Sequence, residues 1–366
     1  MRSLRPQLVL RGREPRWLVL VLVLVAVAAV YVVTAAPIRY AGANPASAYE
    51  RYVLTPLTNT ASLTEVLLAS TPLLFTGLAV AIAFRAGYFN IGAEGQFLAG
   101  AVGASVAGLY LPDLPAPVAI PVAVALGAVA GVVWALLPAL LRVHFRIDEV
   151  VTTLLLNPVA LLGVQGLLNG PWRNSSSGFP VSDNFGSGYE MPAALPGSRV
   201  HLGLVVAGVL ALVTWVLMSR TTTGLRIRAV GLSPRAAGFS GVAVNKVLFG
   251  SALVSGAVAG LGGASQVLGV GQQLTTEVSG GYGYTGIVVA TLGALTAGGV
   301  VLVALLLGDI TVGAQNASLV LQLPPQMGDI IAAALLLTVV SVLTLRHYKM
   351  RLGHSLHGSA EAETDR

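Results

Sequence analysis

Long apolar runs constrain this chain more than any other feature. Most of them are long enough to cross a bilayer as a helix, which takes about 20 residues. The 366-residue sequence holds such runs near 17–36, 66–84, 95–110, 116–140, 149–168, 202–218, 247–269, 284–306, 308–323 and 328–346. Only 10% of the residues are charged, against about a quarter in soluble domains. We therefore predict an all-α, polytopic membrane protein of about ten transmembrane helices.

Two of these runs are short for a full crossing. The segments 95–110 and 308–323 need tilt, re-entry into the membrane or burial behind other helices. The first run follows five arginines, as in a signal peptide, but it exceeds the roughly 7 to 15 apolar residues of a signal sequence, and Pro37 follows the small residues at its end. We expect it to be retained as the first helix.

The basic residues predict the topology, because short cytoplasmic loops are enriched in Lys and Arg. With the N-terminus inside, seventeen of the 21 Lys and Arg residues fall on the cytoplasmic side. The predicted regions are a basic cytoplasmic N-terminus (1–16), a transmembrane domain (17–346) with an external loop (169–201) and a cytoplasmic loop (219–246), and a polar, disordered cytoplasmic tail (347–366). The basic pI of about 9.8 then reflects membrane topology and not binding of nucleic acid.

Several kinds of chemistry are excluded. The chain has no cysteine, and its five histidines lack the spacing of metal ligands, so no metal site is predicted. It has no Gly-Lys-Ser/Thr phosphate loop, no Gly-x-Ser-x-Gly elbow and no His-Glu-x-x-His motif. An enzyme is therefore not expected, and any energy from ATP must come through a partner.

The segment Phe84–Gln96 is the most informative in the chain. Glycine, Asn, Glu and Gln side chains lie there between two apolar runs. Glycines allow a helix to break, and a broken helix at membrane depth exposes polar backbone groups. A carboxylate such as Glu94 near hydrocarbon needs a partner, and Arg85 is the nearest candidate in the sequence. The alternative is a tight cytoplasmic turn in which Glu94 is solvated or caps the next helix.

A weak internal repeat accompanies this segment. Gly87–Gly92 and Gly281–Gly286 share two glycines and a tyrosine at equivalent positions. The predicted topology puts the two segments on opposite sides of the membrane, as an inverted repeat requires. Chance similarity in a chain with 43 glycines is the alternative.

The same segment closely resembles a signature of the permeases of ABC importers for branched-chain amino acids, ribose and nucleosides, in particular the nucleoside and simple-sugar branch. Three further matches follow in order, at Asp148–Asn157, at Gly224–Ala237 and at Ser255–Gly263 with its continuation Gly281–Ile287. The resemblance covers about residues 66 to 345 and implies an all-α permease domain that works in pairs.

The cytoplasmic loop has a physical interpretation of its own. Ser233 followed by Pro234 is a favourable helix start, and the short helix that follows would expose the small residues Ala236, Ala237 and Gly238. It resembles the coupling helix with which such permeases contact their ATPase. The residues assigned to this role are Ser233, Pro234, Arg235, Ala236, Ala237, Gly238 and Phe239. A merely solvated basic loop is the alternative.

Polar and aromatic side chains near the spans are candidates for a substrate path. A polyhydroxylated ligand needs amide donors and acceptors as well as aromatic faces. The candidates are Tyr88, Phe89, Asn90, Glu94, Gln96, Asn157, Gln266, Tyr282 and Tyr284. Each could instead bond to a neighbouring helix.

The resemblance implies the permease subunit of an ATP-driven importer in the plasma membrane, with both termini cytoplasmic. Gly170-Pro171-Trp172 and Leu195-Pro196-Gly197 resemble the longer nucleoside permeases and favour nucleosides over simple sugars. The implied partners are an ABC ATPase that binds ATP and Mg, a second permease subunit, an extracytoplasmic binding protein and membrane lipid; the chain itself needs no cofactor. The alternative is an ion-coupled secondary transporter that uses Glu94, Asp309 or Asp329.

Overall fold

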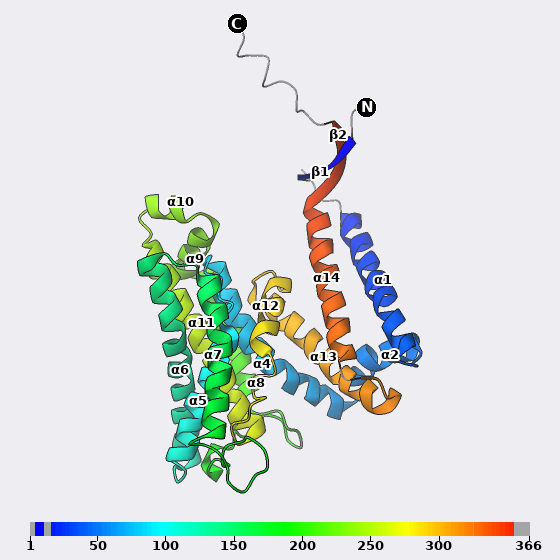
Figure 1. Ribbon diagram of the computed structural model, residues 1–366. Coiled ribbons are helices and arrows are strands. Elements are labelled where there is room, and N and C mark those ends of the chain that lie inside the picture. The colour runs from blue at the N-terminus through cyan, green and yellow to red at the C-terminus, as the bar shows by residue number, and fades with distance from the viewer. Residues whose placement is uncertain (1–3, 11–15, 325, 355–366) are drawn as a thin grey trace. The chain divides into compact units, whose positions relative to one another are not determined.

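The computed structural model describes residues 4–10, 16–324 and 326–354, which are mainly helical (Figure 1). They fall into two compact units: a terminal unit within residues 1–48 and 321–366, and a central unit of residues 49–320.

The terminal unit pairs the two ends of the chain. Helix α1 (Arg16–Tyr40) packs on α14 (Met327–His347), and the short helix α2 (Pro45–Tyr49) follows α1. Strand β1 (Leu4–Leu10) pairs with β2 (Tyr348–His354) in an antiparallel ribbon, with Leu4 opposite His354. The prediction of a disordered tail is therefore wrong for 348–354, and residues 355–366 lie outside the described part. This ribbon is an exception to the predicted all-α class.

The central unit contains the remaining elements. In chain order they are η1 (Glu50–Leu54), α3 (Thr55–Thr58), α4 (Thr60–Arg85), α5 (Ala93–Tyr110), α6 (Ala116–Phe145), α7 (Glu149–Asn169), η2 (Ser187–Tyr189), α8 (Gly203–Arg220), α9 (Thr222–Leu232), α10 (Pro234–Phe239), α11 (Val244–Gln266), η3 (Val267–Gly271), α12 (Tyr282–Leu292) and α13 (Ala297–Leu321). The long helices α4 and α7 and the shorter α9 begin at side-chain caps, because Asn59, Asp148 and Thr221 each accept a hydrogen bond from the first turn that follows.

Six helices within the described residues are long and apolar enough to span a membrane. These are α4, α6, α7, α8, α11 together with η3, and α13. A multi-pass membrane protein is thus supported, while the count of ten spans stays a prediction.

The boundary between the eighth and ninth predicted spans is wrong. The expected helices 284–306 and 308–323 are replaced by α12, with 11 residues, and α13, with 25. The chain turns between them, where Ala294 and Leu295 both have positive φ angles (52° and 56°). At 1.5 Å per residue α12 is about 16 Å long, roughly half of a bilayer core of about 30 Å.

Helix α4 is the central helix of this unit. Every residue from Ser70 to Ala83 is buried, and the helix contacts α8, α11 and α12. Around it α5, α6 and α11 pack closely through glycines. A Cβ at Gly260 would overlap the carbonyl oxygen of Gly127. Small residues at these crossings allow the helix backbones to touch. Close packing of this kind provides van der Waals attraction, which matters because lipid offers no hydrophobic driving force for association of helices.

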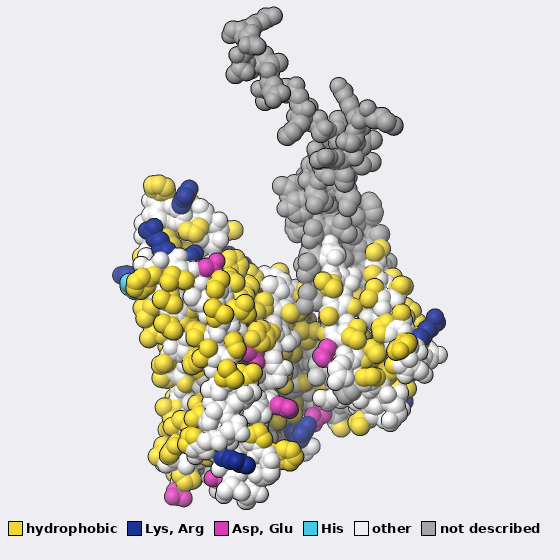
Figure 2. Space-filling view, viewed as in Figure 1, with side chains coloured by type: hydrophobic (Ala, Val, Ile, Leu, Met, Phe, Trp, Pro, Cys, Tyr) yellow, Lys and Arg dark blue, Asp and Glu magenta, His cyan; other side chains and the backbone are white. Residues whose placement is uncertain are grey.

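One end of the central unit is basic. Tyr88, Ala139, Val230, Ala237 and Leu248 form a buried cluster that joins the adjacent ends of α4, α6, α9, α10 and α11. We call this end the basic end, because it carries Arg85, Arg142, Arg146, Arg220, Arg226, Arg228, Arg235 and Lys246. Several Lys and Arg side chains are visible there beside α9 and α10, while hydrophobic side chains cover the flank (Figure 2).

The opposite end carries the segment 169–201, which we call the loop end. The backbone of this segment bonds to the residues after α11: Ser182 donates to the carbonyl of Leu274, and Phe185 donates to that of Gln272. The hydroxyl of Tyr189 donates to the carbonyl of Leu111 (2.8 Å). Short polar side chains and backbone bonds thus hold this long segment against the ends of α5 and α11.

Candidate substrate path and coupling helix

Helices α5 and α12 begin at the same place. Glu94, in the first turn of α5, accepts a hydrogen bond at Oε2 from the backbone N–H of Gly283 in the first turn of α12 (2.7 Å). Its Oε1 accepts a second from the hydroxyl of Ser279 (2.5 Å). A Cβ on Gly283 would overlap the backbone of Glu94, so the two helix starts are in direct contact. We call this contact the half-helix junction.

From the junction the two helices run to opposite ends of the unit. The last residue of α5, Tyr110, accepts a hydrogen bond from the indole of Trp172 at the loop end (3.0 Å). The turn after α12 lies at the basic end, where the carbonyls of Ala294 and Leu295 accept bonds from Arg85. The prediction that the two repeat segments lie on opposite sides of the membrane is wrong, because they meet. The opposed directions of the helices that follow are nevertheless those of an inverted pair.

The prediction that Arg85 is the partner of Glu94 is also wrong. Arg85 uses Nη1 on the backbone oxygens of Ala294 and Leu295, at 3.4 and 3.2 Å. Glu94 is only 6% exposed, and within the described residues it forms no ion pair. Its charge is instead balanced by the N-terminal ends of α5 and α12, where unpaired backbone N–H groups favour a carboxylate. The alternative of a solvated Glu94 is excluded by the same burial.

The predicted amides form a closed network beside the junction. Asn90 donates through Nδ2 to the side-chain oxygen of Gln96 (2.8 Å) and to the hydroxyl of Ser255 (2.9 Å). Its Oδ1 accepts from the backbone of Gly92 (3.0 Å) and from Nε2 of Gln96 (3.2 Å). Both amides are buried. This network fixes the non-helical segment that leads into α5 against α11.

Asn157 holds the same segment from α7. Its Nδ2 donates to the carbonyl of Ile91 and its Oδ1 accepts from the N–H of Gly95, both at 2.9 Å. The hydroxyl of Thr153, one turn earlier, accepts from the N–H of Ile91 (3.1 Å). Because the backbone is not helical between α4 and α5, these side chains satisfy the polar groups that a helix would satisfy internally.

The remaining predicted residues lie around this centre in different settings. Tyr88 is buried in the cluster at the basic end, and Phe89 is half exposed with its ring against Phe84 (5.2 Å between centroids). Tyr282 lies at the junction with its ring against Phe97 (5.9 Å). Tyr284 is exposed two residues later, and Gln266 lies at the far end of α11. The structure thus brings Asn90, Glu94, Gln96, Asn157 and Tyr282 together and leaves Tyr88, Phe89, Gln266 and Tyr284 outside this group.

The short helix predicted in the basic loop is present as α10, Pro234–Phe239. The hydroxyl of Ser233 caps it by accepting from the N–H of Ala236 (3.3 Å), as the Ser-Pro pair predicts. Six of the seven predicted coupling residues are exposed, and Phe239 is 94% exposed. The exception is Ala237, which was expected on the surface but is buried in the cluster with Tyr88 and Leu248. The helix therefore presents one face outward and is anchored by the other.

Sequence reasoning missed several partners of the site. Ser255 and Ser279 bond to Asn90 and Glu94 across 165 and 185 residues of chain. An ion pair joins the partly exposed Arg142 to the buried Glu149 (3.0 Å), and Glu149 also accepts from the N–H of Phe89. The only signal for these residues is a polar side chain next to a glycine or at a helix start. Among the described residues no three His, Asp or Glu side chains lie close enough together to hold a metal ion.

Comparison with known proteins decides the family. Residues 62–361 match the family described as "Branched-chain amino acid transport system / permease component". The chain belongs to this permease family. The resemblance carried by Phe84–Gln96 and the later motifs is thus confirmed, and membership of a transport permease family is consistent with the prediction of a transport subunit.

Relatives of this permease cover most of its length. The guanosine ABC transporter permease protein of Bacillus subtilis is 34% identical over 77% of this chain and 82% of its own. The glucose ABC transporter permease protein of Haloferax volcanii is 32% identical over 95% of this chain and 94% of its own. The nucleoside ABC transporter permease protein NupB of Lactococcus lactis is 29% identical over 81% and 83%. No solved structure matches this permease.

Proposed function

We propose that this permease is the membrane subunit of an ATP-driven importer for nucleosides. Two relatives support nucleosides as the substrate class. One, 34% identical, is named as a guanosine permease, and the other is named as a nucleoside permease. A similarly close relative is named as a glucose permease, so simple sugars are the competing class. Both classes are neutral, polyhydroxylated solutes.

The orientation of the permease in the membrane follows from the distribution of its Lys and Arg residues. The eight Lys and Arg residues of the basic end favour the cytoplasmic side. The segment 169–201 then faces outward, where an extracytoplasmic binding protein would deliver the solute. We also assign both chain ends to the cytoplasmic side, because residues 1–16 and 346–366 carry nine of the 21 Lys and Arg residues.

Helix α10 supports a coupling role. Phe239 offers a nearly fully exposed aromatic side chain to a partner protein, while Ala237 on the opposite face packs with Tyr88 and Leu248. A displacement of α10 by an ABC ATPase would therefore act on α11 and on the segment that leads into α5. ATP and Mg would bind to that ATPase, and a second permease subunit would complete the pair.

The amide network separates the residues that would contact the solute from those that hold the backbone. The polar atoms of Asn90 and Asn157 are already bonded within the chain. Tyr282, Tyr284 and Gln266 make no side-chain hydrogen bond to the described residues. We assign ring and hydroxyl contacts with the solute to Tyr282 beside the junction, and contacts elsewhere along the path to the ring of Tyr284 and the amide of Gln266. Asn90, Gln96 and Asn157 instead maintain the backbone shape of the path.

Competition for uptake tests the substrate class. The complete importer is expressed in cells that lack other nucleoside uptake, and entry of labelled guanosine is measured with excess uridine, ribose or glucose. We expect uridine to compete and glucose to have no effect. Tyr282→Phe should raise the KM for guanosine, while Tyr110→Phe, at the far end of α5, serves as the matched control. Uptake of labelled glucose by the same cells without uptake of guanosine would assign the permease to simple sugars.

A further inference from the structure

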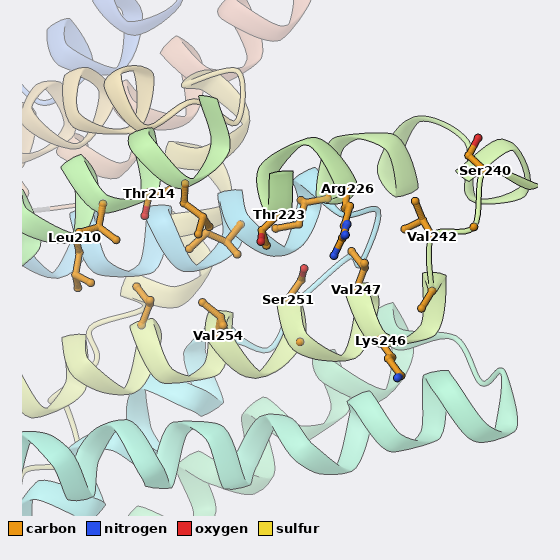
Figure 3. A pocket seen from close by; sticks show the side chains of 18 residues that line it. Leu210, Thr214, Thr223, Arg226, Ser240, Val242, Lys246, Val247, Ser251 and Val254 are labelled. Atoms are coloured by element: carbon orange, nitrogen blue, oxygen red, sulfur yellow. The ribbon is translucent and has the colours of Figure 1, made fainter. Parts of the chain in front are cut away.

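A long groove opens between α8, α9 and α11. Its volume is about 750 Å³, and it runs along α11 from Lys246 to Val258. The walls are mainly apolar, and two of their members, Val213 and Val254, are about half exposed (53% and 47%). Figure 3 shows the groove from Leu210 at one end to Ser240 at the other. The described chain thus leaves an apolar surface uncovered inside a membrane domain.

One end of this groove is cationic. Arg226 points from α9 toward Ser251 on α11, across the width of the groove (Figure 3). Lys246 borders the same end. Both residues are exposed, and neither forms an ion pair or a hydrogen bond with the described residues. The segment 219–246 holds five basic residues and no acidic residue, so no nearby carboxylate in that segment neutralises them.

The length of the groove identifies its occupant. The thirteen residues of α11 from Lys246 to Val258 are separated by twelve rises of 1.5 Å, or about 18 Å of helix. One leaflet of the hydrocarbon core is about 15 Å thick, half of about 30 Å. A transmembrane helix of a second subunit would need a groove through both leaflets. The acyl chain of a lipid in one leaflet needs an apolar channel of about this length, and its headgroup needs a polar site at the end of that channel.

From these observations we infer that the groove binds an anionic phospholipid of the inner leaflet. Its phosphate lies at Arg226 and Lys246, and one acyl chain lies along Val213 and Val254 toward Val258. Basic sites between helices on the cytoplasmic side attract anionic headgroups. The lipid would fill the space between α9, which leads into α10, and α11. This site is independent of the solute that the permease carries.

Gly250 offers a steric probe of the groove. It lines the groove, and a Cβ there would meet no atom within 4 Å. Gly250→Leu therefore places a side chain in the channel without a clash in the chain itself. Gly208 on α8 is equally open but lies outside the groove, so Gly208→Leu is the matched control. For the charge, Arg226→Gln is compared with Arg220→Gln, which lies outside the groove at the end of α8.

The test is native mass spectrometry of the full-length chain titrated with dioleoyl phosphatidylglycerol or dioleoyl phosphatidylcholine. The unchanged protein should bind phosphatidylglycerol in preference. Arg226→Gln should lower that preference about fivefold, the equivalent of about 1 kcal/mol for one cation at an anionic surface. Gly250→Leu should remove binding of either lipid at this site, and both control variants should bind as the unchanged protein does.

Three results would overturn the inference: equal binding of the two lipids, an unaltered preference in Arg226→Gln, or full lipid occupancy in Gly250→Leu. Loss of a dimer in Gly250→Leu with lipid binding unchanged would also overturn it, because a second copy of the chain would then occupy the groove.

Discussion

The carboxylate of Glu94 and the backbone N–H of Gly283 are joined by a hydrogen bond of 2.7 Å across 189 residues of sequence. This bond closes the half-helix junction, where α5 and α12 begin and run to opposite ends of the central unit. Both oxygens of the buried carboxylate have partners, the second being Ser279. The junction therefore depends on this carboxylate, which accepts one hydrogen bond at each oxygen.

Removal of this carboxylate should destabilise the fold. Glu94→Ala leaves the buried N–H of Gly283 and the hydroxyl of Ser279 without an acceptor, and each unsatisfied buried group costs about 1–3 kcal/mol. We expect a loss of at least about 2 kcal/mol in the free energy of unfolding, measured by denaturant titration in micelles. Ser279→Ala, which removes one bond, should cost about 1 kcal/mol. Equal stability of Glu94→Ala and the unchanged protein would contradict the assignment.

Close glycine packing gives a second prediction. Gly260→Ala drives a methyl group into the carbonyl oxygen of Gly127, and overpacking of this kind costs about 1–3 kcal/mol. Gly208→Ala lies on an open face of α8 and should gain up to about 1 kcal/mol from helix propensity. Thermal unfolding in detergent should thus shift in opposite directions for the two variants. A shift of the same sign in both would argue against a close contact of α6 with α11.

A substitution on the exposed face of α10 should weaken binding of the ATPase without lowering the stability of the permease. Phe239→Ser removes an aromatic side chain that is 94% exposed, so the melting temperature should stay within about 1 °C, since such surface changes alter stability by about 0.5 kcal/mol or less. Retention of the ATPase during purification should fall severalfold. Phe179→Ser, at the loop end and 75% exposed, is the matched control. If the ATPase remains bound to Phe239→Ser, α10 is not its main contact.

Acid should destabilise the loop end through His201. Burial lowers the pKa of this imidazole to about 4, whereas an unfolded chain has the ordinary pKa of about 6.5. Between pH 6.5 and 4 the unfolded state binds a proton that the folded state excludes, so stability is complete above this range and falls as the pH drops through it. The melting temperature, measured from pH 7.5 to 4.5, should follow this course.

His201→Asn isolates that contribution. An Asn oxygen can still accept the N–H of Gly203 that Nδ1 of His201 accepts (3.1 Å). Glu190 and Arg199, which line the same cavity of about 240 Å³, are unchanged in the variant. The variant should therefore lose less stability in acid than the unchanged protein. Identical acid profiles would assign the pH dependence to other groups.

Local features of the structure could be predicted from the sequence. The start of α10 follows from Ser233 and Pro234 alone, because a capping hydroxyl and a proline in the first turn act within a few residues. Most long helices follow from apolar runs for the same reason. The inward face of Ala237 could not be predicted, because a six-residue helix has too few positions to show a periodic pattern.

Contacts between distant segments could not be predicted. The sequence suggests Arg85 as the partner of Glu94 because the two residues are close along the chain. In the structure Arg85 donates to the carbonyl of Ala294, and Glu94 accepts from the N–H of Gly283. Both contacts depend on the position of α12, which is distant in sequence. The break at Ala294 and Leu295 lies in a stretch of small and apolar residues, so hydropathy gives no sign of it. Backbone geometry and not composition determines where α12 ends.

We propose that an ATPase acting on α10 drives transport through this permease. The direct measurement is uptake of labelled guanosine into proteoliposomes that contain the complete complex and its binding protein, with ATP inside or outside, for the unchanged permease and for Phe239→Ser. We predict uptake that requires ATP on the side of α10 and that falls severalfold in the variant. Uptake driven by an ion gradient in the absence of the ATPase would contradict this account and favour a secondary transporter.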